Sequence, residues 1–304
     1  MHSPKLQEHR LHDTKTDLIR QLLHKVEQRM HDLVNASNQQ RDKTYTTSTV
    51  AVKYHLESGG QRVRAKLAVH SGIALCLEHE DIVALASTAE LLHNASLVHD
   101  DLQDQDHFRR DKKTVWTVFG SQIAICAGDL LLSAAYGSLA ALQDSRKLTK
   151  LLELVHSRTS LVIQGQCADL AVQARKTMDV AAYETIAIAK SGALLSLPLE
   201  LTLIAAGYEK FIEVARNAAG AFAVGYQIAD DITDVEKDRA LLDKPCALNI
   251  VFVFEADGHG PCSPELARKL GLKRLNEVKS EAKLLPNGSG DFLCNLAENL
   301  SDQL

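Results

Sequence analysis

The chain has 304 residues, a formal net charge of −5, six prolines and only 5% aromatic residues. Its many leucines and alanines, with few alternating β-branched runs, favour helices and predict an all-α fold in one domain over residues 1–304. Because there is no basic excess, nucleic-acid binding has no electrostatic support.

Cysteine usage and the apolar stretches bear on the cellular compartment. Six cysteines are scattered without a CxxC pair, which is typical of reduced thiols in a cytosolic protein. Residues 1–15 are polar, are expected to be flexible, and lack the apolar core of a signal peptide. The long apolar stretches contain Asp129 and Glu200, so neither predicts a membrane span. These features predict a cytoplasmic protein without a transmembrane segment.

An amphipathic helix is predicted from Thr16 to about Asn35, because apolar residues recur there at helical spacing. The polar residues 36–49 predict a loop. The next helix, over residues 50–57, should end at Ser58-Gly59-Gly60, since paired glycines stop helices.

Two arginines, Arg62 and Arg64, follow these glycines. Guanidinium groups match phosphate geometry, so this loop is a candidate phosphate site. Taken alone, two arginines near a loop more often serve surface solubility. Arg62 and Arg64 therefore indicate a phosphate site only in combination with other motifs of the chain.

The stretch from His93 to Thr114 carries an aspartate triad at the end of an apolar run. In a helix, Asp100 and Asp104 lie on one face with Asp101 beside them. Like charges at this spacing repel, so a cation is expected against them. Carboxylates without thiolates select hard ions such as Mg²⁺, which takes phosphate oxygens as further ligands.

A second triad occurs in GYQIADDITD, where Asp230, Asp231 and Asp234 again follow an apolar run. One such motif is more often a solvated acidic face or a helix start. Two copies 130 positions apart favour two metal–carboxylate clusters, which suit a substrate with two or more phosphates.

The spacing of apolar residues predicts helices between these motifs. Pro198 is expected to kink or divide the predicted helix over residues 183–207. The predicted helices span residues 66–77, 81–103, 121–142, 148–172, 183–207, 215–237 and 266–284. The residues after these are polar and are left unassigned. In the run GQCADL, Gln166 and Asp169 predict either a site for polar groups or an interhelical hydrogen bond.

With these motifs in this order, the chain resembles the trans-isoprenyl diphosphate synthases of the polyprenyl synthetase family, which make geranylgeranyl, farnesyl or longer diphosphates. The match runs from about Ser58 to Lys244. The resemblance implies a bundle of ten or more helices around a deep central cavity, with both triads at its mouth. It also implies a homodimer, about three Mg²⁺ ions, and isopentenyl diphosphate and an allylic diphosphate as substrates.

The resemblance further implies residue roles. Catalysis is assigned to Asp100, Asp101, Asp104, Asp230, Asp231 and Lys190. Mg²⁺ binding is assigned to both triads, Asp234 included. Substrate binding is assigned to Arg62, Arg64, His93, Arg109, Arg110, Gln166, Lys190, Ser191, Gln227 and Lys244.

Product length is expected to depend on the residues before the first triad. Family members that make short products commonly carry an aromatic ring four or five positions before it. Here those positions hold Ser96 and Ala95, and Leu92 lies about one turn further. Both residues are small, which predicts products of C20 or longer, with C15 as the alternative.

Three departures from the family pattern keep other functions open. Gln61 replaces a lysine, Ser191 replaces a threonine, and the basic segment expected after Lys244 is absent. A non-catalytic or regulatory subunit of a heteromeric prenyl synthase would explain these changes. A longer-chain heteromeric enzyme is intermediate between such a subunit and a synthase that acts alone. A terpene cyclase and a metal-dependent phosphohydrolase are the remaining alternatives.

Overall fold

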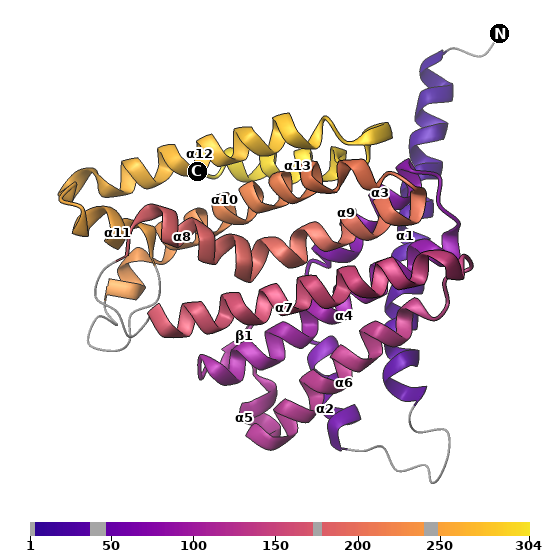
Figure 1. The fold of residues 1–304 in the computed structure, drawn as a ribbon, viewed down its shortest axis with the longest axis horizontal. Coiled ribbons are helices and arrows are strands. Elements are labelled where there is room, and N and C mark those ends of the chain that lie inside the picture. The colour runs from indigo at the N-terminus through magenta and orange to yellow at the C-terminus, as the bar shows by residue number, and fades with distance from the viewer. Residues whose placement is uncertain (1–3, 37–46, 173–177, 240–248) are drawn as a thin grey trace. The chain divides into compact units, whose positions relative to one another are not determined.

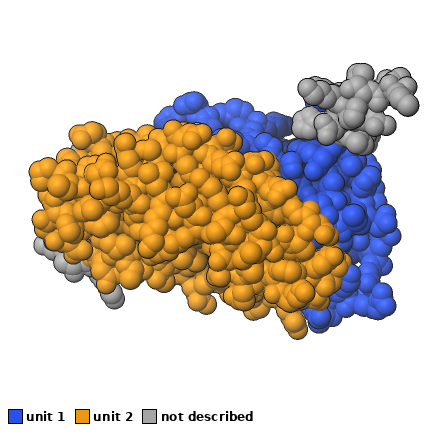
Figure 2. Space-filling view, turned by 90° about the horizontal axis from the view of Figure 1, so that it is seen from above, with its two compact units in different colours: residues 1–152 blue, residues 153–304 orange. Residues whose placement is uncertain are grey.

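The computed structural model describes residues 4–36, 47–172, 178–239 and 249–304, and the chain divides into two compact units, residues 1–152 and 153–304. Helices dominate both units (Figure 1), and Figure 2 colours the units separately. Within the described ranges, the strands are a two-residue pair, β1 (Phe108–Arg109) and β2 (Lys112–Lys113), which form an antiparallel hairpin. The predicted all-α fold is confirmed.

The first unit is built around one helix, α4, which packs against α1, α3 and α6. Every residue from Ile82 to Leu92 is buried, because α4 is covered on all sides. The hydroxyl of Ser138 on α6 donates to the Ala84 carbonyl of α4 at 2.9 Å, which ties the two helices together. The helices of this unit are α1 (Pro4–Ala36), α2 (Thr47–Leu56), α3 (Val63–Ala74), α4 (His79–Gln103), α5 (Val115–Phe119), α6 (Ser121–Leu139) and η1 (Ser145–Lys147), followed by the start of α7 (Leu148–Val172).

The second unit packs α10 against α9, α11 and α12. Its core helix α9 is buried at every position from Ala193 to Ala205, which fits its mostly apolar sequence. Besides most of α7, the unit contains α8 (Val180–Ala187), the π-helical turn η2 (Ile188–Gly192), α9 (Ala193–Ala206), η3 (Glu209–Phe211), α10 (Ile212–Arg239), α11 (Ile250–Ala256), η4 (Gly260–Cys262), α12 (Ser263–Ala282), η5 (Pro286–Gly288) and α13 (Asp291–Ser301).

Four features differ from the sequence predictions. The first helix begins at Pro4, inside the segment that was expected to be flexible. The helix break falls at the π turn, Ile188–Gly192, whereas Pro198 lies inside α9. The atypical segment after Lys244 forms α11, and the polar C-terminal residues form α13, which buries Leu293 and Ala297.

Two helical stretches, Ser121–Leu139 and Val180–Ala206, are long and apolar enough to cross a membrane. In the second, 78% of the apolar window is buried inside the protein. Core helices pass the same length and composition test, so these stretches are weak evidence for a membrane span.

Candidate active site

The first triad lies in the last turn of α4, and its three carboxylates differ in environment. Asp100 is half-buried and Asp104 is exposed, whereas Asp101 is only 1% exposed. Arg109 Nε donates to Asp101 Oδ1 at 2.7 Å, and Asp101 Oδ2 is buried with no hydrogen-bond partner among the described residues. Burial raises the pKa of Asp101 to about 6, against the lowering effect of Arg109. The protein therefore holds the middle carboxylate from one side only.

This donor set fits Mg²⁺. It contains three carboxylates and an unpartnered buried carboxylate oxygen, and hard oxygen ligands are what Mg²⁺ prefers. In the described parts of the chain, no three His, Cys, Asp or Glu side chains converge on one point. Mg²⁺ is usually held by one or two carboxylates together with substrate phosphates, so full protein coordination is not required. Asp100 and Asp104 would hold the ion in this unit.

The hairpin β1–β2 brings Arg110 against the predicted phosphate loop. Its guanidinium donates to the Gly59 carbonyl and lies directly over Gly60. Gly60 has a φ of +140°, a backbone conformation that favours glycine, and its lack of a side chain leaves room for the Arg110 guanidinium. Tyr54 on α2 anchors the hairpin through its hydroxyl, which donates to the Lys113 carbonyl at 2.8 Å.

Three arginines surround His93, and we call Arg64, His93, Arg109 and Arg110 the basic cluster. Burial lowers the pKa of His93 well below its ordinary value, and the charges of Arg64, Arg110 and Arg109 lower it further. His93 is therefore a neutral imidazole among guanidinium groups. The charges of the three arginines act together at His93, and a group of guanidinium side chains suits a phosphate anion. The substrate-binding roles assigned to these four residues stay predictions.

Arg62 has different surroundings. It begins α3 with a left-handed backbone (φ 51°), and its Nε donates to Glu27 Oε1 of α1 at 2.5 Å. Its Nη1 lies 3.8 Å from Glu90 Oε1 of α4. Two carboxylates thus neutralise Arg62, which fixes the loop and leaves the basic cluster to carry the charge. Sequence reasoning missed Glu27 and Glu90, although a glutamate within the apolar run of α4 was a signal for a buried partner.

His55 extends this buried polar network. Its Nε2 lies 3.1 Å from Asn94 Oδ1, and Asn94 Nδ2 donates to the Glu90 carbonyl at 2.7 Å. Burial lowers the pKa of His55 to about 4, and the charges of Arg109, Arg110 and Arg62 add to this effect. His55 is therefore neutral at physiological pH.

A pH-dependent stability follows from His55. The unfolded chain binds its proton below about pH 6.5 and the folded protein only below about pH 4, so this residue makes unfolding easier as the pH falls through that window. The full effect is about 3 kcal/mol. Glutamine does not titrate, so His55→Gln should lack this pH dependence. The difference in unfolding free energy between the parent protein and the variant should therefore become smaller as the pH falls from 6.5 to 4. Chemical denaturation across this range measures it, and a constant difference would contradict the assignment.

The second triad lies on α10. Asp230 is exposed and Asp234 is half-exposed, whereas Asp231 is 4% exposed. Although Asp230 is exposed at the surface, partial desolvation of its carboxylate by the surrounding protein, and then the charge of Asp234, raise its pKa to about 6. Asp231 Oδ1 accepts from Gln227 Nε2 at 2.8 Å, and its Oδ2 accepts from the Tyr183 hydroxyl at 2.7 Å. Burial raises the pKa of Asp231 to about 7 although these hydrogen bonds oppose it.

Both triads thus share one arrangement, in which the protein holds the middle carboxylate and leaves the first and third more open. Asp230 and Asp234 would hold Mg²⁺ in the second unit, by the same donor chemistry as in the first. The metal-binding roles assigned to all six aspartates stay predictions. Gln227, assigned to substrate, donates to Asp231 in this structure.

The π turn presents Lys190 and Ser191. A Cβ at Gly165 of α7 would lie 2.7 Å from the Lys190 backbone nitrogen, so glycine lets α7 approach the turn closely. Lys190 Nζ donates to Asp169 Oδ2 at 2.6 Å, which makes Asp169 of the GQCADL run an interhelical ion-pair partner. π turns are frequent at functional sites, in agreement with the role predicted for Lys190.

The remaining assigned residues lie as follows. Gln166 is buried on α7, and Lys244 lies outside the described residues. On α4, Ala95 and Leu92 are buried, and Ser96 donates its hydroxyl to the His93 carbonyl at 2.9 Å. The roles assigned to these positions stay predictions.

Two aspartate triads, a basic cluster and a lysine on a π turn, carried by a helical fold, are side chains suited to a diphosphate substrate. The family model of the polyprenyl synthetases matches residues 46–250, two thirds of the chain. The chain therefore belongs to the polyprenyl synthetase family and is a prenyltransferase of the isoprenyl diphosphate synthase class.

Individual relatives agree with this assignment. The chain is 31% identical over 231 residues to the short chain isoprenyl diphosphate synthase of Methanocaldococcus jannaschii, covering 75% of this chain and 68% of that protein. It is 27% identical over 276 residues to the short chain isoprenyl diphosphate synthase of Methanothermobacter thermautotrophicus, covering 90% and 80%. The fold is similar to that of a geranylgeranyl pyrophosphate synthetase from the archaeon Geoglobus acetivorans, with a TM-score of 0.81, 21% identity, and coverage of 94% and 99%.

Proposed function

We propose that the protein is a Mg²⁺-dependent trans-prenyltransferase that condenses an allylic diphosphate with isopentenyl diphosphate. The product is a longer all-trans prenyl diphosphate, with C20 or longer favoured. One observation carries the proposal: in each triad the first and third carboxylates are more exposed than the middle one, and each unit adds cationic side chains, the basic cluster in unit 1 and, in unit 2, Lys190 on the π turn that packs against the triad helix α10. The names of the curated relatives support the same reaction.

Asp100, Asp104, Asp230 and Asp234 would hold Mg²⁺, and the bound ion would supply charge neutralisation for the diphosphate that leaves. Arg109 and Lys190 would each add positive charge beside a diphosphate bound in its own unit. The allylic C–O bond breaks, and its electron pair departs with pyrophosphate. The double bond of isopentenyl diphosphate, bound by Arg64 and His93, attacks the allylic carbon and forms the new C–C bond. A proton is then lost, with the departing pyrophosphate as the proposed acceptor, and a new double bond forms.

Incubation of purified protein with Mg²⁺, isopentenyl diphosphate and each allylic diphosphate tests the proposal. Chromatography of the products should show longer prenyl diphosphates. A cyclic hydrocarbon would favour the terpene cyclase alternative. No product from the protein alone, with product after addition of a second synthase subunit, would favour the regulatory-subunit alternative.

Isopentenyl diphosphate affinity should depend on Arg64 and Gln61. Arg64→Ala should raise the KM for isopentenyl diphosphate about ten- to a hundredfold, because a charge-assisted contact is lost. Gln61→Lys should lower this KM by adding a cation beside the loop. Arg146→Ala is the matched control, since Arg146 is exposed and pairs with Asp144. Steady-state kinetics with varied isopentenyl diphosphate measures both effects. Unchanged KM values in both variants would place the binding site elsewhere.

We also propose homodimer assembly and a cytoplasmic location, both on the family resemblance and the sequence. Light scattering of the purified protein tests the first, and localisation of a tagged full chain tests the second.

A further inference from the structure

The atypical segment that follows Lys244 forms a junction with the second triad. Asn249 is buried, and its Nδ2 donates to the Asp231 carbonyl and to Asp238 Oδ2, both at 2.9 Å. Its Oδ1 accepts from the Val251 amide at 3.0 Å and so caps α11. The next amide, that of Ile250, donates to Asp231 Oδ2 at 2.8 Å. The start of α11 is therefore bound to α10 at the middle aspartate.

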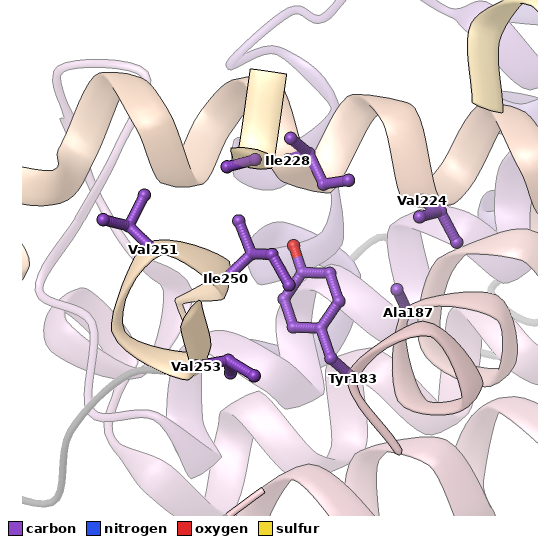
Figure 3. Close-up of a cluster of buried hydrophobic side chains, with 8 residues drawn as sticks. Tyr183, Ala187, Val224, Ile228, Ile250, Val251 and Val253 are labelled. Carbon is purple, nitrogen blue, oxygen red and sulfur yellow. The ribbon is translucent and has the colours of Figure 1, made fainter. Parts of the chain in front are cut away.

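Tyr183 reaches the same carboxylate from α8. Its ring is fully buried in an apolar cluster that the structure assembles from α8, α10, α11 and α12 (Figure 3). The hydroxyl leaves this cluster and donates to Asp231 Oδ2 at 2.7 Å. The cluster consists of Tyr183, Ala187, Val224, Ile228, Ile250, Val251, Val253 and Ala267. A buried phenol hydroxyl requires a hydrogen-bond partner. The apolar packing therefore fixes the Tyr183 ring so that its hydroxyl points at Asp231, and the hydrogen bond in turn holds the ring in the cluster.

Asp231 thus accepts three hydrogen bonds, from α8, from α10 itself and from the first residue of α11. Both carboxylate oxygens are used inside the protein. The neighbouring Asp230 and the later Asp234 remain more exposed on the same helix. α8 also continues directly into the π turn, so the Tyr183–Asp231 bond fixes the register between the segment of Lys190 and the triad helix.

We propose that Tyr183 and Asn249 are positioning residues, which hold α10 through Asp231 so that Asp230 and Asp234 are preorganised for Mg²⁺ and diphosphate. This inference rests on the proposed function for the role of those two aspartates. It assigns a purpose to the segment in which this chain departs from the family pattern. A site held within a fraction of an ångström needs such supporting hydrogen bonds.

Tyr183→Phe removes one hydroxyl and keeps the ring, and Asn249→Ser removes the amide donor while keeping a helix-capping oxygen. Each variant should lower kcat, about ten- to a hundredfold for Tyr183→Phe, and raise the Mg²⁺ concentration for half-maximal rate. The KM for isopentenyl diphosphate should stay at its parental value. Tyr208→Phe is the control, since the Tyr208 hydroxyl makes only a long contact, 3.5 Å, with Asn287.

Hydrogen exchange of the metal-free protein provides a readout that does not depend on activity. Amides of residues 228–234 and of Ile250 should exchange faster in Tyr183→Phe than in the parent and the control. If Tyr183→Phe fails to fold, Asn249→Ser decides the question. Parental kcat, parental Mg²⁺ dependence and unchanged exchange would overturn the inference. If the parent protein lacks synthase activity, the proposed function fails, while the exchange comparison still supports or overturns the junction.

Discussion

Asp100→Ala and Asp230→Ala should each lower kcat by at least about a hundredfold, because under the proposed mechanism each removes a carboxylate that would hold the metal at the diphosphate. The fold should persist. Asp230 carries a raised pKa through partial desolvation and the charge of Asp234, so its removal relieves an unfavourable charge in the metal-free protein. Initial rates at saturating substrate measure the first effect, and thermal unfolding followed by circular dichroism measures the second.

The matched control for this pair is Asp106→Ala. Asp106 is an exposed aspartate two residues after the first triad, and its interactions with Thr114 and Trp116 use the backbone carbonyl. It should therefore keep a nearly parental rate. Near-parental rates in both Asp100→Ala and Asp230→Ala would show that the two-triad mechanism is wrong.

Ala95→Phe should shift the products towards C15 without abolishing the first condensation. Position 95 lies on the helix of the first triad, and a phenyl ring there would shorten the path of the growing prenyl tail while leaving the aspartates untouched. Because Ala95 is buried, the larger side chain should also cost about 1–3 kcal/mol of stability. Chromatography of products from one allylic primer measures the shift.

Ala140→Phe serves as the control for the added ring, since Ala140 is exposed at the end of α6. Its product distribution should match that of the parent. If Ala95→Phe folds and also gives the parental distribution, the tail does not pass this position.

The sequence predicted the fold class and the two triads because both depend on residues that are close together in the sequence. An apolar run followed by closely spaced aspartates needs only helical periodicity to place Asp100 and Asp104 on one face. The same reasoning predicted α7 over residues 148–172, with the bounds that the structure shows. The C-terminal helix α13 was missed although Leu293, Leu296 and Leu300 recur there at helical spacing, a signal that the polar residues between them obscured.

The different roles of neighbouring site residues could not be predicted from the local sequence pattern. Arg62 and Arg64 look equivalent in sequence, yet Arg62 pairs with Glu27, which lies 35 positions earlier. Asp231 looks equivalent to Asp230, yet its hydroxyl donor, Tyr183, lies 48 positions away. Such hydrogen bonds depend on tertiary packing, and no helical or strand period encodes them.

The stoichiometry of pyrophosphate release tests the proposed condensation most directly. Purified protein with Mg²⁺, an allylic diphosphate and radiolabelled isopentenyl diphosphate should release one pyrophosphate for each isopentenyl unit that enters a longer product. Both signals should disappear when the metal is chelated and return when Mg²⁺ is restored. Pyrophosphate or phosphate release without chain growth, or chain growth that persists without divalent metal, would contradict the proposed reaction.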